Sequence, residues 1–299
     1  MSTGLLLGLF ASLAWGGVDV VAALAARRLG SLRVLAASQL ASVAGLGLVI
    51  VSDPARLGPD AMDGIRAGLP LGLLAAVAYL AYFTALRIGP ISVVSPVIVA
   101  YGGTTVVLAV LFRGETLLPA QVVGTVVATA GVVLAGLVFD ERSLQTARIV
   151  GPGVLVALLT MLLFAILTVL LSDPIRTHGW LPVVLGSRIA NAGAGLLLLG
   201  LALRTGAPRL RPLMRPFAGW DRTAVALVVA AGVFDIAAFT AYAIGLEVAP
   251  VWLVGLASSF GPVIAIGYAV WRLGERPHRS QWLGVALIGV GVVVLALAG

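Results

Sequence analysis

Long apolar runs separated by short polar segments make up almost the whole chain. A helix needs about 20 apolar residues to cross the hydrocarbon core of a bilayer. The connections are short except for the polar segments 53–66 and 204–222. The pattern predicts an all-α, polytopic membrane protein with ten transmembrane helices, at residues 4–26, 33–52, 67–88, 91–112, 119–139, 150–171, 181–203, 223–246, 250–272 and 281–298.

The pattern of polar and glycine positions occurs twice. Residues 81–136 align with residues 241–296 at a constant offset of 160 without a gap, and 14 of the 56 pairs are identical. Composition alone does not explain the identical pairs Tyr82/Tyr242, Pro90/Pro250, Glu115/Glu275 and Gln121/Gln281. A fixed internal period of this kind indicates a duplicated unit. We therefore expect two five-helix repeats, at residues 1–140 and 150–299.

Five spans is an odd number, so the second repeat must enter the membrane in the opposite sense to the first. The expected architecture is a 5+5 inverted repeat. In transporters, inverted repeats place the binding site near the bilayer midplane between the two halves, and rocking of the halves exposes it to each side in turn.

Composition agrees with a membrane protein. Hydrophobic residues make up 61% and charged residues 10% of the chain, whereas soluble domains have about 45–50% and about 25%. All 19 basic residues are arginines, and most lie between apolar runs, so the net charge of +7 does not indicate a nucleic-acid partner. The expected partners are the lipid bilayer and a small-molecule substrate; the oligomeric state stays open.

Several motifs carry a family resemblance. Trp15-Gly16 lies in the first span, and a Gly-Glu pair follows the fourth and ninth spans, with Gln and two Gly residues at the same spacing after each pair. With the arrangement of five spans plus five, this pattern resembles the EamA-type members of the drug/metabolite transporter superfamily. The resemblance implies a ten-helix carrier that exports or exchanges small metabolites, amino acids or drugs. The bacterial plasma membrane is the expected location.

Three charged residues lie well inside predicted spans: Asp19, Arg188 and Asp235. A charge at the centre of a membrane helix costs about 2.5–3.5 kcal/mol on insertion scales, so each needs a reason. One interpretation is an internal ion pair of Arg188 with either acid. The other is that at least one acid lines the cavity and binds substrate or a proton, since two acids and one base leave an uncompensated carboxylate.

Helical spacing adds neighbours to these charges. Trp15 is four residues from Asp19, Asn191 is three from Arg188, and Phe239 and Tyr242 follow Asp235 on one face. The aligned positions in the first repeat hold Tyr79 and Tyr82, and Gln39 aligns with Arg188 at an offset of 149. These residues are candidates for the wall of a substrate cavity; ordinary helix packing or an interfacial aromatic belt is the alternative.

The fourth and ninth spans contain the residues expected to interrupt them. These are Pro96, Gly102 and Gly103 in the fourth span, and Ser258, Ser259, Gly261 and Pro262 in the ninth. Interrupted helices free backbone groups, which at membrane depth are tolerated only beside protein or a watery cavity. We expect Ser258 and Ser259 to bind substrate or take part in coupling and the prolines and glycines to shape or gate the cavity, with a kink that serves packing alone as the alternative.

The sequence favours transport over other functions. The two histidines, His178 and His278, lie in connections, cysteine is absent, and no spacing typical of a metal site or a nucleotide-binding loop occurs, so we expect no metal, no cofactor and no enzymatic activity. Glu115 and Glu275 are expected to pair with neighbouring arginines at the interface. The prediction is a secondary active transporter using alternating access, with proton coupling open; a flippase for lipid-linked substrates on the same scaffold is the alternative.

Orientation can be tested directly, because the chain has no cysteine of its own. Fourteen arginines lie in the odd-numbered connections and four in the others, so the positive-inside rule places both termini outside; the family resemblance implies the reverse. From the charge count we expect Ser2→Cys to react with an impermeant thiol reagent in intact cells and Arg209→Cys to be protected. Labelling of position 209 from outside would reverse this orientation.

Overall fold

The computed structural model describes residues 3–89, 91–136, 152–205, 213, 220–261, 264 and 279–298, and every regular element in them is a helix. The first half contains α1 (Thr3–Leu29), α2 (Ser31–Ser52), the 3₁₀ helix η1 (Pro54–Leu57), α3 (Ala61–Ile88), α4 (Ile91–Val99), α5 (Tyr101–Arg113) and α6 (Pro119–Gly136). The second half contains α7 (Pro152–His178), α8 (Trp180–Thr205), α9 (Arg222–Val248), α10 (Val251–Ala257) and α12 (Arg279–Ala298).

Six of these helices, α1, α2, α3, α7, α8 and α9, are long and apolar enough to cross a membrane. The all-helical membrane fold is therefore confirmed, whereas the count of ten spans stays a prediction. The predicted boundaries are too narrow for some helices: α3 begins at Ala61 and α7 continues to His178. The reason is that the end turns of a span lie at the water boundary, where polar residues are compatible with a helix.

The fourth predicted span is two helices rather than one. α4 ends at Val99 and α5 begins at Tyr101, with Ala100 between them. In the second half α10 ends at Ala257, and Ser258 to Gly261 are not helical. Ala100 and Phe260 differ by the repeat offset of 160, so the two interruptions occur at matching positions.

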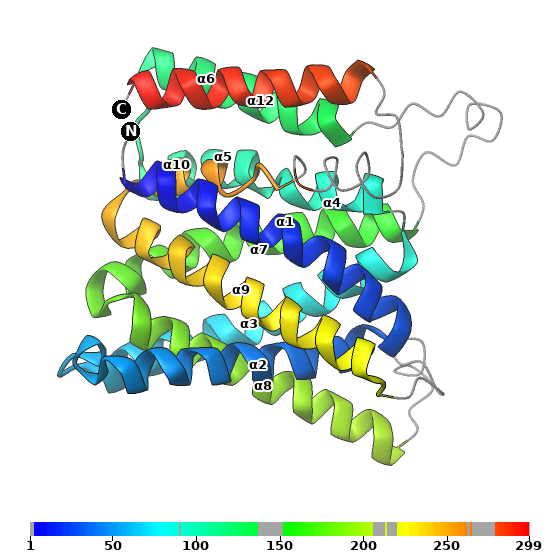
Figure 1. Cartoon of the computed structure of the whole chain (residues 1–299). Helices are drawn as coiled ribbons and strands as arrows, with labels where there is room; N and C mark the ends of the chain where they lie inside the picture. The colour runs from blue at the N-terminus through cyan, green and yellow to red at the C-terminus, as the bar shows by residue number, and fades with distance from the viewer. Residues whose placement is uncertain are drawn as a thin grey trace.

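Helices of one half pack mainly against helices of the other half, and the contacts of the two halves correspond. α1 packs along α9 and α3 packs along α7, while α2 contacts both α8 and α9 and α3 also contacts α8. α2 and α8, which occupy the same place in the two repeats, run in opposite directions (Figure 1). Exchanging the halves leaves this list of neighbours unchanged, as an inverted repeat requires. The structure is thus held together mainly by contacts between the halves.

Corresponding residues also make corresponding local contacts. Gly30 and Gly179, 149 residues apart, have φ angles of 85° and 80° in the turns after α1 and α7. Arg27 donates to the carbonyl of Gly89 at the end of α3 (3.1 Å). Its counterpart Arg176 donates to the carbonyl of Ala249 after α9 (2.7 Å). Each arginine satisfies a backbone acceptor that the end of a helix leaves open.

Glycines allow α3 and α8 to pack backbone against backbone. A Cβ atom added at Gly68 would overlap the carbonyl oxygen of Val183, and one added at Gly72 would overlap that of Ser187. Small residues at such crossings let membrane helices approach closely, which is the main source of packing energy where lipid is as apolar as the protein. This close crossing holds the middle of α8, which carries Arg188, against the centre of the bundle.

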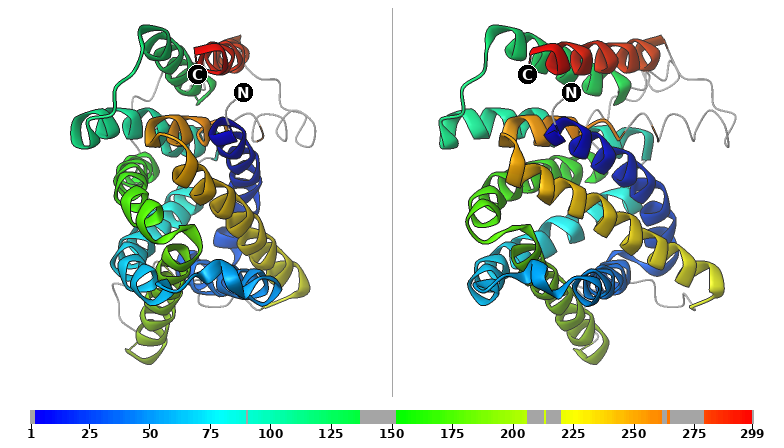
Figure 2. Two further views of the ribbon diagram at one scale, coloured as in Figure 1. Left: turned by 90° about the vertical axis from the view of Figure 1, so that its left-hand side faces the viewer. Right: turned by 60° about the vertical axis from the view of Figure 1, so that its left-hand side comes forward.

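α6 and α12 form a separate layer. They pack along each other and lie beyond α5 and α10, at the top of Figure 1, and the views in Figure 2 show the same arrangement. Gly291 of α12 lies against Ala128 of α6. Large apolar side chains such as Leu111 and Leu297 are 70% and 84% exposed, a pattern that a surrounding membrane explains because lipid covers them.

The expected pairing of Glu115 with Arg113 is corrected by the structure. Glu115 accepts hydrogen bonds from the backbone N–H groups of Val251 and Trp252, both 3.1 Å long. Arg113 instead pairs with Asp173 of α7, with Nη2 and Oδ1 2.5 Å apart. The first N–H groups of a helix have no partner within the helix and attract a carboxylate. Glu115 therefore binds the start of α10 rather than Arg113. Glu275 lies outside the described residues.

The crossing of α3 and α8 can be tested by adding a side chain to one of its glycines. We expect Gly68→Val to destabilise the protein by about 1–3 kcal/mol, the usual cost of overpacking, and to lower its thermal unfolding temperature in detergent. Gly47→Val is the matched control, since nothing lies within 4 Å of a Cβ added there. Equal unfolding temperatures for both variants would contradict the close crossing.

Candidate functional site

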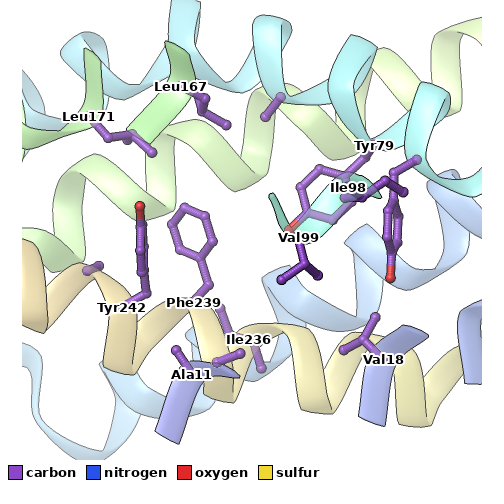
Figure 3. Packing of buried hydrophobic residues seen from close by; sticks show 14 of the residues in the cluster. Ala11, Val18, Tyr79, Ile98, Val99, Leu167, Leu171, Ile236, Phe239 and Tyr242 are labelled. Atoms are coloured by element: carbon purple, nitrogen blue, oxygen red, sulfur yellow. The ribbon is translucent and has the colours of Figure 1, made fainter. Parts of the chain in front are cut away.

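A cavity of about 70 Å³ lies between the two halves. Its wall comes from α1, α3, α4, α5, α7, α9 and the residues that follow α10. In Figure 3, Phe239 and Tyr242 project from α9, Leu167 and Leu171 lie opposite them, and Tyr79 lies to one side. The cavity is small beside the roughly 300–1,000 Å³ of usual ligand pockets.

Asp235, the acid of an ion pair between α8 and α9, lines the cavity. Arg188 Nη1 and Asp235 Oδ2 are 2.7 Å apart, and the two side chains are 1% and 3% exposed. Asp235 also accepts hydrogen bonds from Tyr79 Oη (2.6 Å), Trp15 Nε1 (3.2 Å) and Ser42 Oγ (3.3 Å). Of the two partners that the sequence left open for Arg188, the structure therefore shows Asp235.

Arg188 is held in place from several sides. It donates to Gln39 Oε1 (2.7 Å), which also accepts from Asn191 Nδ2 (3.0 Å). Its guanidinium carbon lies 4.1 Å from the ring centroid of Phe239 and 5.3 Å from that of Tyr79. Arg188 and Asn191 do not line the cavity themselves. Arg188 binds the carboxylate of Asp235 directly, and Asn191 shares with Arg188 the acceptor Gln39 Oε1.

Asp19 of α1 has a different environment. It is 5% exposed and accepts a hydrogen bond from Tyr82 Oη (2.5 Å) and another from the hydroxyl of Ser95. No basic side chain in the part of the chain that the structure describes pairs with it. Asp19 lines the cavity, and when ionised it is the uncompensated member of the charged trio.

Two groups of aromatic rings line the cavity, and each joins the halves. Phe164 of α7 lies 5.5 Å from Tyr79 and 5.9 Å from Tyr82 of α3, measured between ring centroids. Trp15 of α1 lies 6.3 Å from Phe239 and 5.2 Å from Tyr242 of α9. In each group, a ring from the first helix of one half inserts beside two rings from the third helix of the other half. A further ring, Tyr101, lies 6.1 Å from Phe164.

The repeat offsets explain this arrangement. In the alignment of the two repeats at an offset of 149, Trp15 corresponds to Phe164 and Asp19 corresponds to Thr168. Tyr82 donates to Asp19, and its counterpart Tyr242 donates to Thr168 Oγ1 (2.6 Å). The hydrogen bond is the same in both halves, but the acceptor is a carboxylate in one and a hydroxyl in the other. The two matched positions thus differ in charge while keeping the same hydrogen bond.

The helix interruptions meet at the cavity. Tyr101 Oη and Ser258 Oγ are 2.6 Å apart and join the start of α5 to the end of α10. A Cβ atom added at Gly102 would overlap Ser259 Oγ, and one added at Gly103 would contact Thr129. Ser259 itself donates to the carbonyl of Gly255 (2.9 Å). The first of these glycines therefore allows the two interrupted helices to approach closely.

The structure brings together most of the residues that the sequence singled out. Those that line the cavity are Trp15, Asp19, Tyr79, Tyr82, Asp235, Phe239, Tyr242, Ser258 and Gly261. Pro96 lies within α4, and Pro262 is outside the described residues. Sequence reasoning missed Phe164, Thr168, Tyr101 and Ser95. The offset of 149 would have found the first two as the counterparts of Trp15 and Asp19.

In the part of the chain that the structure covers, no group of three His, Cys, Asp or Glu side chains is placed to hold a metal ion. The described wall of the cavity offers two carboxylates, those of Asp19 and Asp235, together with hydroxyl groups and aromatic faces.

Comparison with known proteins bears on the whole chain. The model of the EamA-like transporter family matches residues 2–137 and, a second time, residues 151–297. A solved structure titled "Crystal structure of protein" has a TM-score of 0.73 to this chain at 22% sequence identity, with 99% of each chain covered. At that identity the likeness concerns the fold alone. The comparison with curated proteins gave no significant match.

The buried ion pair can be tested by removing one charge and then both. We expect Asp235→Asn to destabilise the protein by about 3–5 kcal/mol, because it leaves Arg188 buried without a counter-ion. Adding Arg188→Gln to the same chain should recover much of this loss. Thermal unfolding of the purified variants in detergent measures both effects. Arg188→Gln alone is measured for comparison. If the losses of stability of the two single variants simply add in the double variant, the charges are not coupled.

Proposed function

The chain belongs to the EamA-like transporter family, and from this premise we propose that it is a secondary active transporter that moves a small solute through the cavity between its halves by alternating access. The solute is a metabolite, an amino acid or a drug-like molecule. We also propose that the protein lies in the bacterial plasma membrane. Its two repeats are proposed to be residues 1–140 and 150–299.

The observation that carries the proposal is the position of the cavity. It lies on the seam between the halves, and residues of both halves form its wall, for example Asp19 and Tyr82 on one side and Phe164 and Tyr242 on the other. A movement of one half relative to the other would change the access to such a cavity without changing the fold of either half. Carriers built from inverted repeats work in this way.

Contacts between α5 and α10 support the existence of a closed side. Glu115, after α5, binds the first N–H groups of α10, and Thr105 lies against Gly255. Arg113, at the end of α5, binds Asp173 of α7. These contacts all join α5, or the residue pair that follows it, to the second half. In the proposed cycle they break when that side opens, and the polar ones then exchange protein partners for water.

Asp19 is the proposed coupling or binding residue. A buried carboxylate without a basic partner is costly, and binding of a proton or a positively charged solute group removes that cost. Asp235 is already compensated by Arg188. Of the two acids in the cavity, Asp19 is thus the one whose state a solute or a proton changes most.

The proposal predicts that Asp19→Asn stays folded but loses transport. The reason is that the amide keeps the size of the side chain and removes the charge, which costs about tenfold or more where a charged hydrogen bond is lost. The measurement is counterflow in proteoliposomes, with solutes chosen by a thermal-shift screen of amino acids, sugars, polyamines and cationic dyes.

Asp63→Asn is the control, because this carboxylate is on the surface and 63% exposed. Full counterflow by the Asp19 variant would remove Asp19 from the mechanism. Wild-type protein that binds a solute yet gives no counterflow of it would contradict the transporter itself.

A further inference from the structure

The charge of the cavity restricts the kind of solute that it can bind. Two carboxylates line it, Asp19 and Asp235. Arg188 neutralises Asp235 at 2.7 Å, whereas the donors to Asp19 among the described residues are the hydroxyls of Tyr82 and Ser95. None of the described residues that form the wall is an arginine or a histidine. The net charge that a solute meets is therefore negative, and it is concentrated at Asp19.

The aromatic wall points to the same kind of solute. The face of an aromatic ring is electrically negative and attracts cations within about 6 Å of its centroid. Phe164 with Tyr79, Tyr82 and Tyr101 forms one group of rings, and Trp15 with Phe239 and Tyr242 forms the other. Cages of rings around a carboxylate suit ammonium groups, whose methyl or methylene carbons pack on the rings while the charge is compensated.

The protein already uses these rings to stabilise a cation of its own. The guanidinium carbon of Arg188 lies 4.1 Å from the centroid of Phe239 and 5.3 Å from that of Tyr79. Both rings also line the cavity. Their electrostatics thus favour positive charge in the cavity.

Anionic and neutral solutes fit less well. An anion would meet Asp19 without a basic side chain to compensate it in the described wall, and like charges in low dielectric repel strongly. A neutral solute would leave Asp19 as it is, buried and unpaired. A cation removes the cost of the unpaired carboxylate, and its own desolvation is offset by Asp19 and the rings.

On the basis of the proposed transport function, we propose that the substrate is a small organic cation, an ammonium group on a compact apolar or aromatic body, whose charge is bound by Asp19 between the two groups of rings. The cavity of about 70 Å³ is smaller than the whole of such a solute, so the proposal requires the cavity to expand on binding. Phe164 is assigned as a binding residue that contributes its ring face.

Binding can be measured on the whole purified protein in detergent. The probes are choline, tetraethylammonium and benzyltrimethylammonium, with 3,3-dimethylbutan-1-ol as the uncharged isostere of choline and benzoate as an anion. Isothermal titration calorimetry is expected to show at least one cation binding at least tenfold more tightly than the isostere and benzoate. Asp19→Asn should weaken that cation tenfold or more, and Asp63→Asn should not.

Phe164→Leu provides a second test that keeps the carboxylate, in case Asp19→Asn fails to fold. It should weaken the cation several-fold and leave the weak binding of the neutral isostere unchanged. The inference is overturned if all three cations bind no more tightly than the isostere, or if Asp19→Asn and Phe164→Leu both bind them as the wild type does. Counterflow of a neutral or anionic solute in the same preparations would overturn the cation assignment while leaving the transport function intact.

Discussion

A charge inside a bilayer has to find its partner within the protein, and the pair formed by Arg188 and Asp235 meets this constraint. The partners come from α8 and α9, which follow each other in the second half, but the groups that orient them come from the first half: Gln39 and Ser42 from α2, and Tyr79 from α3. The pair therefore requires both halves to be in place. Polar contacts of this kind specify a unique packing among helices whose apolar surfaces are nearly interchangeable.

Around this pair the bundle is assembled by close backbone contact. The glycines of α3 and α8 remove the side chains that would otherwise separate the helices, and van der Waals contact supplies the attraction that the hydrophobic effect cannot supply between helices in lipid. The same closeness determines which side chains reach the cavity. Because α3 packs on both α7 and α8, Tyr79 contacts Phe164 on one and Arg188 on the other.

Much of this could be predicted from the sequence because membrane helices are long, apolar and interrupted at recognisable residues. Charged residues inside apolar spans could be recognised because placing a charge in a membrane helix costs free energy. The offset of 160 aligned Tyr79 with Phe239 and Tyr82 with Tyr242. The partners of Asp19 could not be predicted, since Tyr82 and Ser95 are 63 and 76 residues away and a helix that is apolar on all sides gives no sign of which face meets the cavity. For the same reason Phe164 resembled any other apolar residue of α7. Glu115 binds the N-terminus of α10, a helix of the other half. Spacing along the chain does not show that these two segments meet.

The mirrored hydrogen bonds of Tyr82 and Tyr242 have an energetic consequence. In a carrier made of two identical inverted halves, the two end states would exchange the roles of the halves and have equal free energy. Here one tyrosine donates to a carboxylate and the other to a threonine hydroxyl, so the exchange is not neutral. The differences between Asp19 and Thr168 and between Asp235 and Ala75, its partner at the offset of 160, make the two halves chemically unequal. Under the proposed alternating access, the two end states of the empty protein would therefore differ in free energy.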